Sequence, residues 1–243
     1  MAKQPHINVD KTQVSDKVIV CGDPARVERI AKFLQHPILI SENREYRVMN
    51  GDYQGQKITV CSTGIGAPSM IIAVEELKNC GAKYIIRVGS AGALQSNIAL
   101  GELIIAEAAV RHDGGSKTYV EAAFPAIADI DLIVSLRQNL QSLNYPFHSG
   151  IIRSHDSFYT DEEDDVCRYW NKKGVLGAEM ETAALLTVGR LRGIKTASIL
   201  NNVVLFQQDV QEGVNDYVND SDIMMKGEQM TIKSALLALS EQP

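Results

Sequence analysis

The sequence predicts an α/β fold, a single domain in which a central mixed β-sheet lies between two layers of helices. Short runs rich in β-branched residues alternate with longer segments of helical period, as expected when helices cover both faces of a largely parallel sheet. The 243 residues are 45% hydrophobic and 22% charged, which is ordinary for a globular protein. No internal repeat, low-complexity tract or change of composition marks a linker, so we predict one domain over residues 1–243.

The amino-terminal half is predicted to supply three strands and two helices. The strands are the short apolar runs Lys17–Cys21, Lys57–Ser62 and Tyr84–Val88. Asp23 and Pro24 are typical of a helix N-cap and a first helical turn, and they predict a helix over Pro24–Leu34. A second helix is predicted to run from near Pro68 toward Gly81. The glycine-rich segment Gly89–Gly92 predicts a turn that ends the third strand.

The carboxyl-terminal half continues the alternation. Two segments are predicted to be extended, Gly101–Arg111 and Phe147–Ser154, and three are predicted to be helical, Ile130–Leu143, Glu181–Arg192 and Asp222–Leu239. In sheets of this kind, ligands bind beyond the carboxyl ends of the strands. The segments that follow the predicted strands are therefore where functional residues are expected.

Composition restricts the class of protein. The chain carries 24 Lys and Arg against 30 Asp and Glu, a net charge of −6. This acidic balance disfavours nucleic-acid and membrane-surface binding, because both need a basic surface. The four cysteines show no metal-ligand spacing, which indicates reduced thiols. The amino terminus lacks the apolar run of a signal peptide, and no apolar stretch could cross a bilayer, so we predict a soluble cytoplasmic protein.

The first candidate site is the segment from Gly22 to Arg26, where a strand turns directly into a capped helix. Such a turn presents backbone N–H groups at the positive end of the helix dipole, where an anion can bind. A cation in the first helical turn is unfavourable, and a bound phosphate paired with Arg26 would remove that penalty. The alternative is a capped helix with a solvent-facing arginine.

The second candidate site is the segment from Arg87 to Gly92. Arg87 interrupts an otherwise apolar strand, and an unpaired buried charge there would be very costly, so the arginine is either paired or functional. Ser90 follows at the end of the strand between two glycines, where its hydroxyl could bind an anion. The alternative is a structural salt bridge for Arg87.

The third candidate site consists of two carboxylates, Glu179 and Glu181, which flank Met180 where a strand-like segment becomes a helix. Carboxylates accept hydrogen bonds from sugar hydroxyls and stabilise an oxocarbenium-like sugar. The alternative is that both are acidic residues that favour the helix dipole. The five histidines show no metal-binding spacing, and no metal site is predicted from this pattern.

Six ordered motifs along nearly the whole chain make it similar to the nucleoside phosphorylases that include uridine phosphorylase and bacterial purine nucleoside phosphorylase. They are GDPARV at 22–27, NREY at 43–46, STGIGAPS at 62–69, RVGSAG at 87–92, FPAIADID at 124–131 and EMET at 179–182. The resemblance implies the nucleoside phosphorylase fold. It also implies an enzyme of nucleoside salvage that uses phosphate to release a base and yield (deoxy)ribose 1-phosphate.

The resemblance implies roles that agree with the candidate sites. The phosphate site would consist of Gly22, Arg26, Arg87, Ser90 and, from a neighbouring subunit, Arg44. The ribose site would consist of Glu179, Met180 and Glu181, with His6 reaching across a subunit interface to the 5′-hydroxyl. Arg87 and Glu181 would be the catalytic residues, because Arg87 holds the attacking phosphate and Glu181 holds the 2′ and 3′ hydroxyls.

The base end departs from both patterns of this family. Phe158 matches an aromatic residue that lines the sugar and base pocket. The glutamine and arginine with which uridine phosphorylases bind uracil are replaced by Glu162 and Asp164, and a later arginine falls near Gln207. The aspartate of the purine enzymes falls on Val204 or Leu205. The base-pocket candidates are therefore Phe158, Glu162 and Gln207.

The amino-acid sequence of the motifs as a whole favours a uridine phosphorylase-like enzyme, with a purine nucleoside phosphorylase as the alternative. A nucleosidase and a nucleoside-binding protein without turnover are two further alternatives on the same fold. The resemblance implies no cofactor beyond phosphate, although Glu45, Ile65 and Ser69 match positions that bind a monovalent cation such as potassium between subunits in some uridine phosphorylases. It also implies a homo-oligomer, a hexamer built from dimers with shared active sites.

Overall fold

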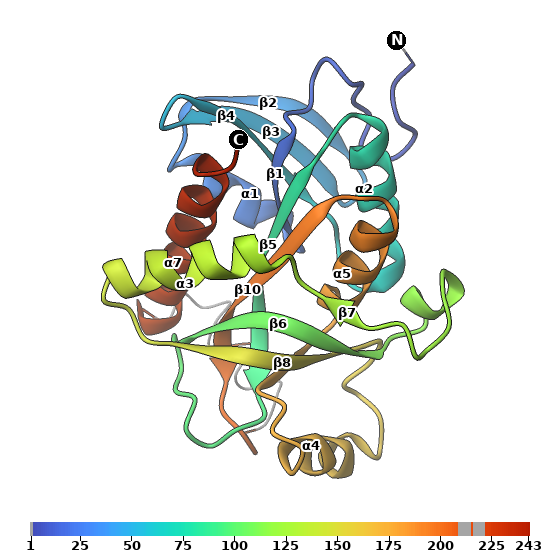
Figure 1. Ribbon diagram of the computed structural model, residues 1–243, viewed down its shortest axis with the longest axis vertical. Helices are drawn as coiled ribbons and strands as arrows, with labels where there is room; N and C mark the ends of the chain where they lie inside the picture. Colours follow the sequence, from blue (N-terminus) through green and yellow to red (C-terminus); the bar gives the residue numbers. More distant parts are fainter. Residues whose placement is uncertain (1, 209–214, 216–221) are drawn as a thin grey trace.

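The predicted α/β class is confirmed in the computed structural model, which describes residues 2–208, 215 and 222–243. The strands are β1 (Lys17–Cys21), β2 (Gln35–Asn43), β3 (Tyr46–Tyr53), β4 (Gln56–Ser62), β5 (Tyr84–Ala93), β6 (Leu103–His112), β7 (Ala126–Ile127), β8 (Phe147–His155), β9 (Gly177–Glu179) and β10 (Lys195–Val204). The helices are α1 (Pro24–Ala31), α2 (Ala67–Asn79), α3 (Ile130–Ser142), α4 (Glu163–Asn171), α5 (Thr182–Leu191) and α7 (Asp222–Ser240), with a short 3₁₀ turn, η1 (Ser116–Thr118). Figure 1 shows their arrangement.

The described strands form one mixed sheet in the order β10-β6-β8-β9-β5-β1-β4-β3-β2, with β7 beside β6. Strand β1 runs parallel to β4 and β5, and β5 runs parallel to β10, whereas β2, β3 and β4 pair antiparallel. Because β10 pairs with β5 as well as β6, the strands β5, β10, β6, β8 and β9 close into a ring. The ring gathers the ends of several strands at one place.

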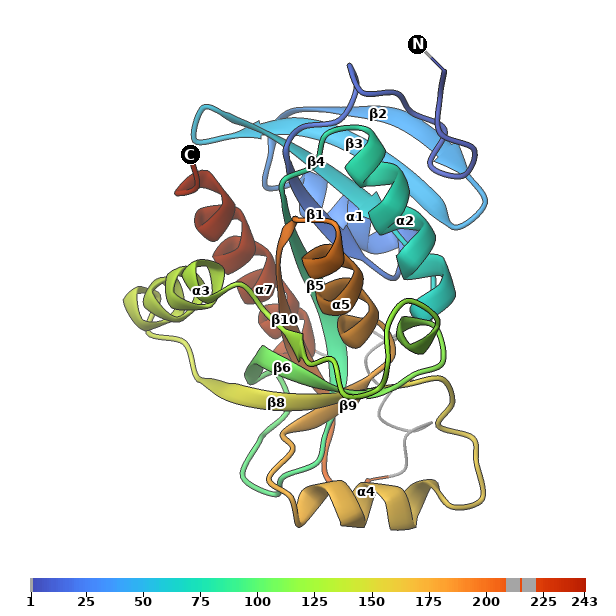
Figure 2. The same cartoon turned by 45° about the vertical axis from the view of Figure 1, so that its right-hand side comes forward.

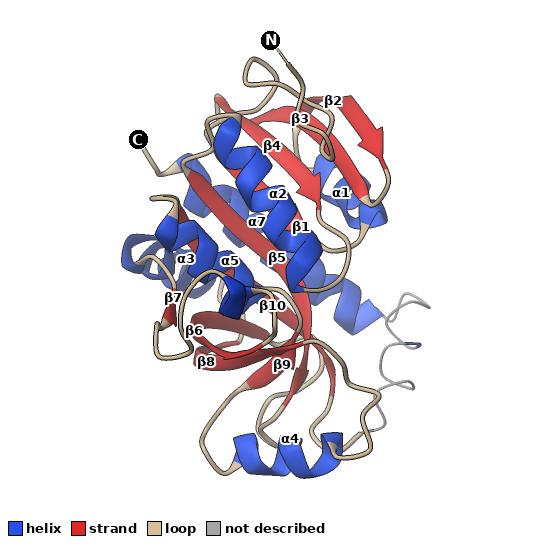
Figure 3. Ribbon diagram, turned by 90° about the vertical axis from the view of Figure 1, so that its right-hand side faces the viewer, coloured by secondary structure: helices blue, strands red, loops and turns tan. Residues whose placement is uncertain are grey.

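Helices cover both faces of the sheet, as predicted. Helices α2 and α5 pack on one face with the apolar cluster that includes Met70 and Leu185. Helices α1 and α7 pack on the other face, where Val27 and Leu236 belong to a second cluster (Figure 3). Helix α4 lies apart from these layers, beyond β8 (Figures 1 and 2). Among the described helices, none is both long enough and apolar enough to cross a membrane.

The prediction of a turn at Gly89–Gly92 was wrong, because β5 continues to Ala93. The segment stays extended since β10 pairs with β5 as far as Gly92, and β9 pairs with Gly92 from the other side. A Cβ atom at Gly89 would lie 2.7 Å from the guanidinium carbon of Arg87 and 2.8 Å from Leu200. Glycine is thus needed at position 89 for the arginine to lie close to its own strand.

Three of the four cysteines, Cys21, Cys61 and Cys80, are buried, and Cys167 is half-buried; all four are free thiols. Burial raises the pKa of the Cys21 thiol to about 12. The thiol next to Gly22 is therefore neutral at physiological pH and adds no charge to the neighbouring candidate anion site.

Candidate active site

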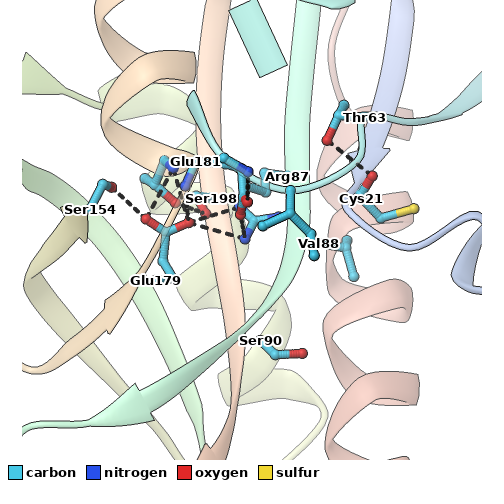
Figure 4. Close-up of polar contacts among 12 residues, drawn as sticks. Cys21, Thr63, Arg87, Val88, Ser90, Ser154, Glu179, Glu181 and Ser198 are labelled. Carbon is cyan, nitrogen blue, oxygen red and sulfur yellow. Dashed lines mark hydrogen bonds and ion pairs between the residues drawn. The ribbon is translucent and has the colours of Figure 1, made fainter. Parts of the chain in front are cut away.

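Five of the predicted phosphate and ribose residues come together where β1 and β4 end beside the middle of β5 and β10: Arg26, Arg87, Ser90, Glu179 and Glu181. Arg87 and Ser90 lie on β5, Arg26 lies on α1 directly after β1, and Glu181 directly precedes α5. Figure 4 shows Arg87 among the two glutamates, with Ser90 farther along the same strand. The convergence follows from the sheet, because the parallel register sets Val20, near the end of β1, beside Arg87 on β5.

Arg87 is held by both carboxylates of the EMET motif. Its Nη2 atom lies 2.6 Å from Glu181 Oε2 and 3.0 Å from Glu179 Oε2, and its Nε atom donates to Glu179 Oε2 at 3.1 Å. The side chains are 4% (Arg87), 2% (Glu179) and 7% (Glu181) exposed. The two alternatives for Arg87 therefore coincide, because the buried salt bridge joins a predicted phosphate ligand to the predicted ribose ligands.

Glu179 holds the start of helix α5. Its carboxylate accepts hydrogen bonds from the backbone N–H groups of Glu181 at 2.9 Å and Thr182 at 3.0 Å, and from the Ser154 hydroxyl. These N–H groups have no partner inside the helix, so a carboxylate at this position stabilises the helix end. With Arg87 also bound, the contacts favour a positioning role for Glu179, and its assignment as a direct ribose ligand stays a prediction.

Glu181 is fixed from a second side by the loop after β4. The backbone N–H of Gly66 donates to Glu181 Oε1 at 2.5 Å, while Arg87 binds the other oxygen. Burial raises the pKa of the Glu181 carboxyl, and the nearby Arg87 opposes that rise. Gly66 has φ 92°, a backbone conformation that favours glycine. The loop of the STGIGAPS motif thus presents a backbone amide to Glu181, the predicted catalytic carboxylate.

Arg26 and Ser90 also lie together. Arg26 Nη2 donates to Ser90 Oγ at 2.8 Å, and Nη1 donates to the carbonyl of Val88 at 3.2 Å. Because an arginine can only donate, Ser90 Oγ accepts in this contact and its own hydroxyl hydrogen can be donated to an anion. Gly22 lies beside them: a Cβ at this position would be 3.2 Å from the carbonyl oxygen of Gly64. The solvent-facing alternative for Arg26 was wrong, since the residue is 5% exposed.

One residue of this site was not predicted. Glu228 on α7 accepts a hydrogen bond from Arg26 Nε at 2.7 Å and also binds Arg29. The glutamate is 2% exposed, although it is separated from Arg26 by 202 positions in the sequence. Glu228 lies four positions after Met224 and four before Ile232, which are both buried on α7. An acidic residue at this helical spacing from apolar residues is the sequence signal that could have identified it.

His6 and Arg44, the two residues predicted to serve a neighbouring subunit, lie on the same part of the surface. The side-chain amide of Asn43 donates to the backbone carbonyl of His6 at 2.7 Å, and Arg44 follows Asn43 in the exposed turn between β2 and β3. The His6 ring contacts Glu76 at 2.7 Å. Within the described residues, neither His6 nor Arg44 forms a hydrogen bond or ion pair with Arg87, Ser90 or Glu181.

Glu45, one of the three residues predicted to bind a monovalent cation, directly follows Arg44, and the other two are Ile65 and Ser69. Ser69 Oγ donates to the carbonyl of Ile65 at 3.0 Å, and a Cβ at Gly64 would meet the Glu45 side chain at 2.8 Å. Ile65 is 77% exposed. Among the residues that the structure describes, no three His, Cys, Asp or Glu side chains gather in a group that could hold a metal ion.

The residues predicted to line the base pocket are less buried than the two glutamates that bind Arg87. Phe158 is half-buried and packs on Tyr159, with ring centroids 4.5 Å apart, and edge-on against His155 at 6.4 Å. Glu162 and Gln207 are exposed. Of the two positions where the aspartate of purine enzymes would fall, Val204 is buried in β10 and Leu205 is exposed.

A polar cluster behind Phe158 was also missed. The buried side chain of Arg153 on β8 pairs with Glu163 on α4 at 2.6 Å, and its Nε donates to His112 at 3.1 Å. Burial is the main reason that the pKa values of His112 and His155 are lowered, which favours neutral rings. Arg153 follows only two isoleucines and precedes Ser154 and His155, so its sequence lacks the apolar run that made Arg87 conspicuous.

The sequence matches the phosphorylase superfamily over residues 16–213, most of the chain. This chain belongs to that superfamily. In sequence it is 60% identical to the uridine phosphorylase of Vibrio fischeri ES114, whose crystal structure in complex with 6-hydroxy-1-naphthoic acid matches it with a TM-score of 0.94, covering 100% of this chain and 98% of that one. It is 39% identical over 199 residues to the guanosine phosphorylase of Halorubrum lacusprofundi, with 82% of each chain covered.

The uridine phosphorylase of Thermococcus kodakarensis is likewise 39% identical, over 212 residues that cover 81% of this chain and 75% of that protein. These likenesses confirm the predicted superfamily and the predicted enzyme class: the chain is a nucleoside phosphorylase, a pentosyltransferase. They also confirm the predicted fold, a single α/β domain with a mixed sheet. They do not test the residues of the site, whose roles stay predictions.

Proposed function

We propose that this enzyme cleaves uridine with inorganic phosphate, releasing uracil and ribose 1-phosphate. The observation that carries the proposal is Arg87, which is bound to Glu181 at 2.6 Å and lies three residues before Ser90 on β5. Together with Arg26, these side chains offer cationic and hydroxyl donors to a phosphate and a carboxylate to a sugar. Both reactants would be held side by side, which supplies much of the acceleration in a two-substrate reaction.

In the proposed reaction, a phosphate oxygen forms a bond to the anomeric carbon as the bond from that carbon to the base nitrogen breaks. The bonding electrons leave with the base, which must gain a proton or an equivalent hydrogen bond. Positive charge develops on the sugar, and the phosphate oxygens and Glu181 stabilise it. Arg26 and Arg87 hold the phosphate below the sugar, and the amide of Gly66 keeps Glu181 in place.

The choice of base rests on likeness, since the usual uracil ligands are replaced by Glu162 and Asp164. Uridine is favoured by the 60% identity with the V. fischeri uridine phosphorylase. Guanosine is the second candidate, because the H. lacusprofundi guanosine phosphorylase is 39% identical. Phe158 could stack on either kind of base, so its presence does not distinguish them.

A nucleoside panel tests the proposal. Base release is measured from uridine, thymidine, inosine, guanosine and adenosine, each with and without inorganic phosphate. We expect uridine to give the highest kcat/KM, and cleavage to require phosphate. Preferred cleavage of guanosine or inosine would replace uridine by a purine nucleoside. Equal rates without phosphate would favour a nucleosidase, and cleavage of no nucleoside at high phosphate would indicate a binding protein.

We further propose a cytoplasmic homohexamer built from dimers, with inorganic phosphate as its only required partner and an interfacial potassium ion as an option at Glu45, Ile65 and Ser69. The free state of the cysteines supports the location. The exposure of Arg44 supports shared sites, since a cationic side chain predicted to bind phosphate would otherwise face solvent. A role in nucleoside salvage follows from the reaction.

Complementation tests the shared site. Arg44→Ala and Arg87→Ala should each be almost inactive alone, because each removes a proposed phosphate ligand. If the two arginines serve one site from different subunits, a dimer of the two variants contains one site with both changes and one with neither. Random mixing during co-expression should then restore about a quarter of wild-type activity. Mixtures as inactive as the separate variants would place Arg44 outside the shared site.

A further inference from the structure

We propose that Glu228 is a positioning residue of the phosphate site, which sets the orientation of Arg26 and thereby the affinity for phosphate. This inference rests on the proposed phosphorolysis. Glu228 lies on α7 and contacts the site through Arg26 and Arg29. Its carboxylate is 2% exposed, and a buried carboxylate is stabilising only when its charge is paired.

The contacts of Arg26 define one orientation of its guanidinium group. Nε donates to Glu228, Nη1 to the Val88 carbonyl and Nη2 to Ser90 Oγ, with distances of 2.7, 3.2 and 2.8 Å. Because a guanidinium is planar, acceptors at all three nitrogens fix both its position and its plane. The contact from Glu228 is the charged one of the three, and charge-assisted hydrogen bonds are the stronger kind. Removing it would release the plane that directs Nη2 to Ser90.

Glu228 also pairs with two cationic side chains at once, those of Arg26 and Arg29. Arg26 and Arg29 are three positions apart on α1, so their side chains are neighbours on the helix and would repel each other. Glu228 Oε1 accepts a hydrogen bond from Arg29 Nε. Glu228 Oε2 accepts one from Arg26 Nε at 2.7 Å and one from Arg29 Nη2 at 3.0 Å. Arg29 also pairs with Asp23 at 3.1 Å, so two carboxylates balance the two arginines. Glu228 thus permits two arginines to lie side by side at this place.

The competing explanation is that Glu228 only ties α7 to α1. Helix α7 is indeed closely packed here, since a Cβ at Gly227 would lie 2.1 Å from Asn201 Oδ1. The two explanations differ in what they expect of the folded enzyme. A purely structural tie changes the melting temperature alone, whereas a positioning residue changes the KM for phosphate and leaves that for uridine almost unaltered.

The test compares Glu228→Gln with Glu28→Gln in the full-length enzyme. Glu28 also lies on α1, but its half-exposed carboxylate pairs with Arg47 on β3, so this control removes one carboxylate charge outside the proposed phosphate site. Three quantities are measured: KM for inorganic phosphate, KM for uridine, and the rise in melting temperature caused by phosphate alone.

We expect Glu228→Gln to raise the KM for phosphate about 10- to 100-fold, the usual effect of losing a charged hydrogen bond, and the KM for uridine less than about twofold. The phosphate-dependent rise in melting temperature should shrink accordingly. Glu28→Gln should change both constants less than about twofold. Glu228→Asp, which keeps the charge but shortens its reach, should give an intermediate KM for phosphate, and it decides the matter if the glutamine variant does not fold.

A KM for phosphate within about twofold of wild type in Glu228→Gln or Glu228→Asp, with only a lower melting temperature, would overturn the positioning role. That result would leave the proposed function intact. Phosphate-independent cleavage by the wild-type enzyme would instead overturn the proposed function, and the phosphate site that Glu228 serves would fall with it.

Discussion

Arg87→Ala is expected to lower kcat/KM by on the order of 10³-fold or more, and the residual rate should no longer depend on phosphate. The variant removes a proposed phosphate ligand and, in the same step, the cation that binds both Glu179 and Glu181. Base release is measured across a range of phosphate concentrations. A variant with near-normal kinetics would contradict the assignment of Arg87 to the phosphate site.

The same substitution should also destabilise the fold, because it leaves two buried carboxylates without their arginine. Breaking a buried ion pair on one side costs about 3–5 kcal/mol, so activity must be referred to the folded fraction. Arg87→Lys serves as the second variant: it keeps the charge but loses the forked contact, and it should recover stability better than activity. Arg137→Ala is the matched control, since Arg137 is half exposed and pairs with Glu107 at 3.5 Å on the surface.

Several residues that sequence analysis brought together lie on or directly after strands of the parallel part of the sheet. Arg26 and Ser90 were predicted from two separate strand ends, and the structure places their side chains 2.8 Å apart. Parallel pairing of β1 with β5 explains this, because it sets Val20, just before the end of β1, beside Arg87 on β5. Local patterns therefore carried much of the site without knowledge of the tertiary structure.

The parts that sequence analysis missed depend on contacts between distant segments. Glu228 meets Arg26 across 202 positions, and no local pattern on α7 states which face receives an arginine. The extension of β5 through Gly92 depends on pairing with β9 and β10, whereas glycines alone are typical of a turn. The base end is harder still, since Glu162 and Gln207 lie exposed near loops whose conformation the neighbouring strands do not impose.

Glu181→Gln is expected to cost about 2–4 kcal/mol of transition-state stabilisation on uridine, on the order of 10²-fold in kcat/KM. The amide keeps the size of the side chain, but it removes the charge that would stabilise the sugar cation. It also places an N–H₂ group next to Arg87 or the Gly66 amide, which are both donors. Thermal unfolding of the variant shows how much of the loss is structural.

A substrate that lacks the 2′-hydroxyl distinguishes a ribose-binding role of Glu181 from a purely structural one. If Glu181 binds the 2′ and 3′ hydroxyls, 2′-deoxyuridine already lacks one of these contacts, and the variant should lose less activity on it than on uridine. The two changes would then be non-additive, as expected of groups that touch. An equal loss on both substrates would mean that Glu181 does not bind the 2′-hydroxyl.

The pH dependence gives an independent measure of the same carboxylate. Burial raises the pKa of Glu181 above the ordinary glutamate value of 4.5, although Arg87 opposes the rise. The ionised form accepts the sugar hydrogen bonds, and it is lost as the pH falls through the raised pKa. The acid limb of kcat/KM should therefore lie above pH 4.5 in the wild-type enzyme and be absent in Glu181→Gln, whose amide does not titrate. An acid limb that persists in the variant would have to come from another group, such as the phosphate itself, and Glu181 would then not be the residue whose ionisation controls turnover.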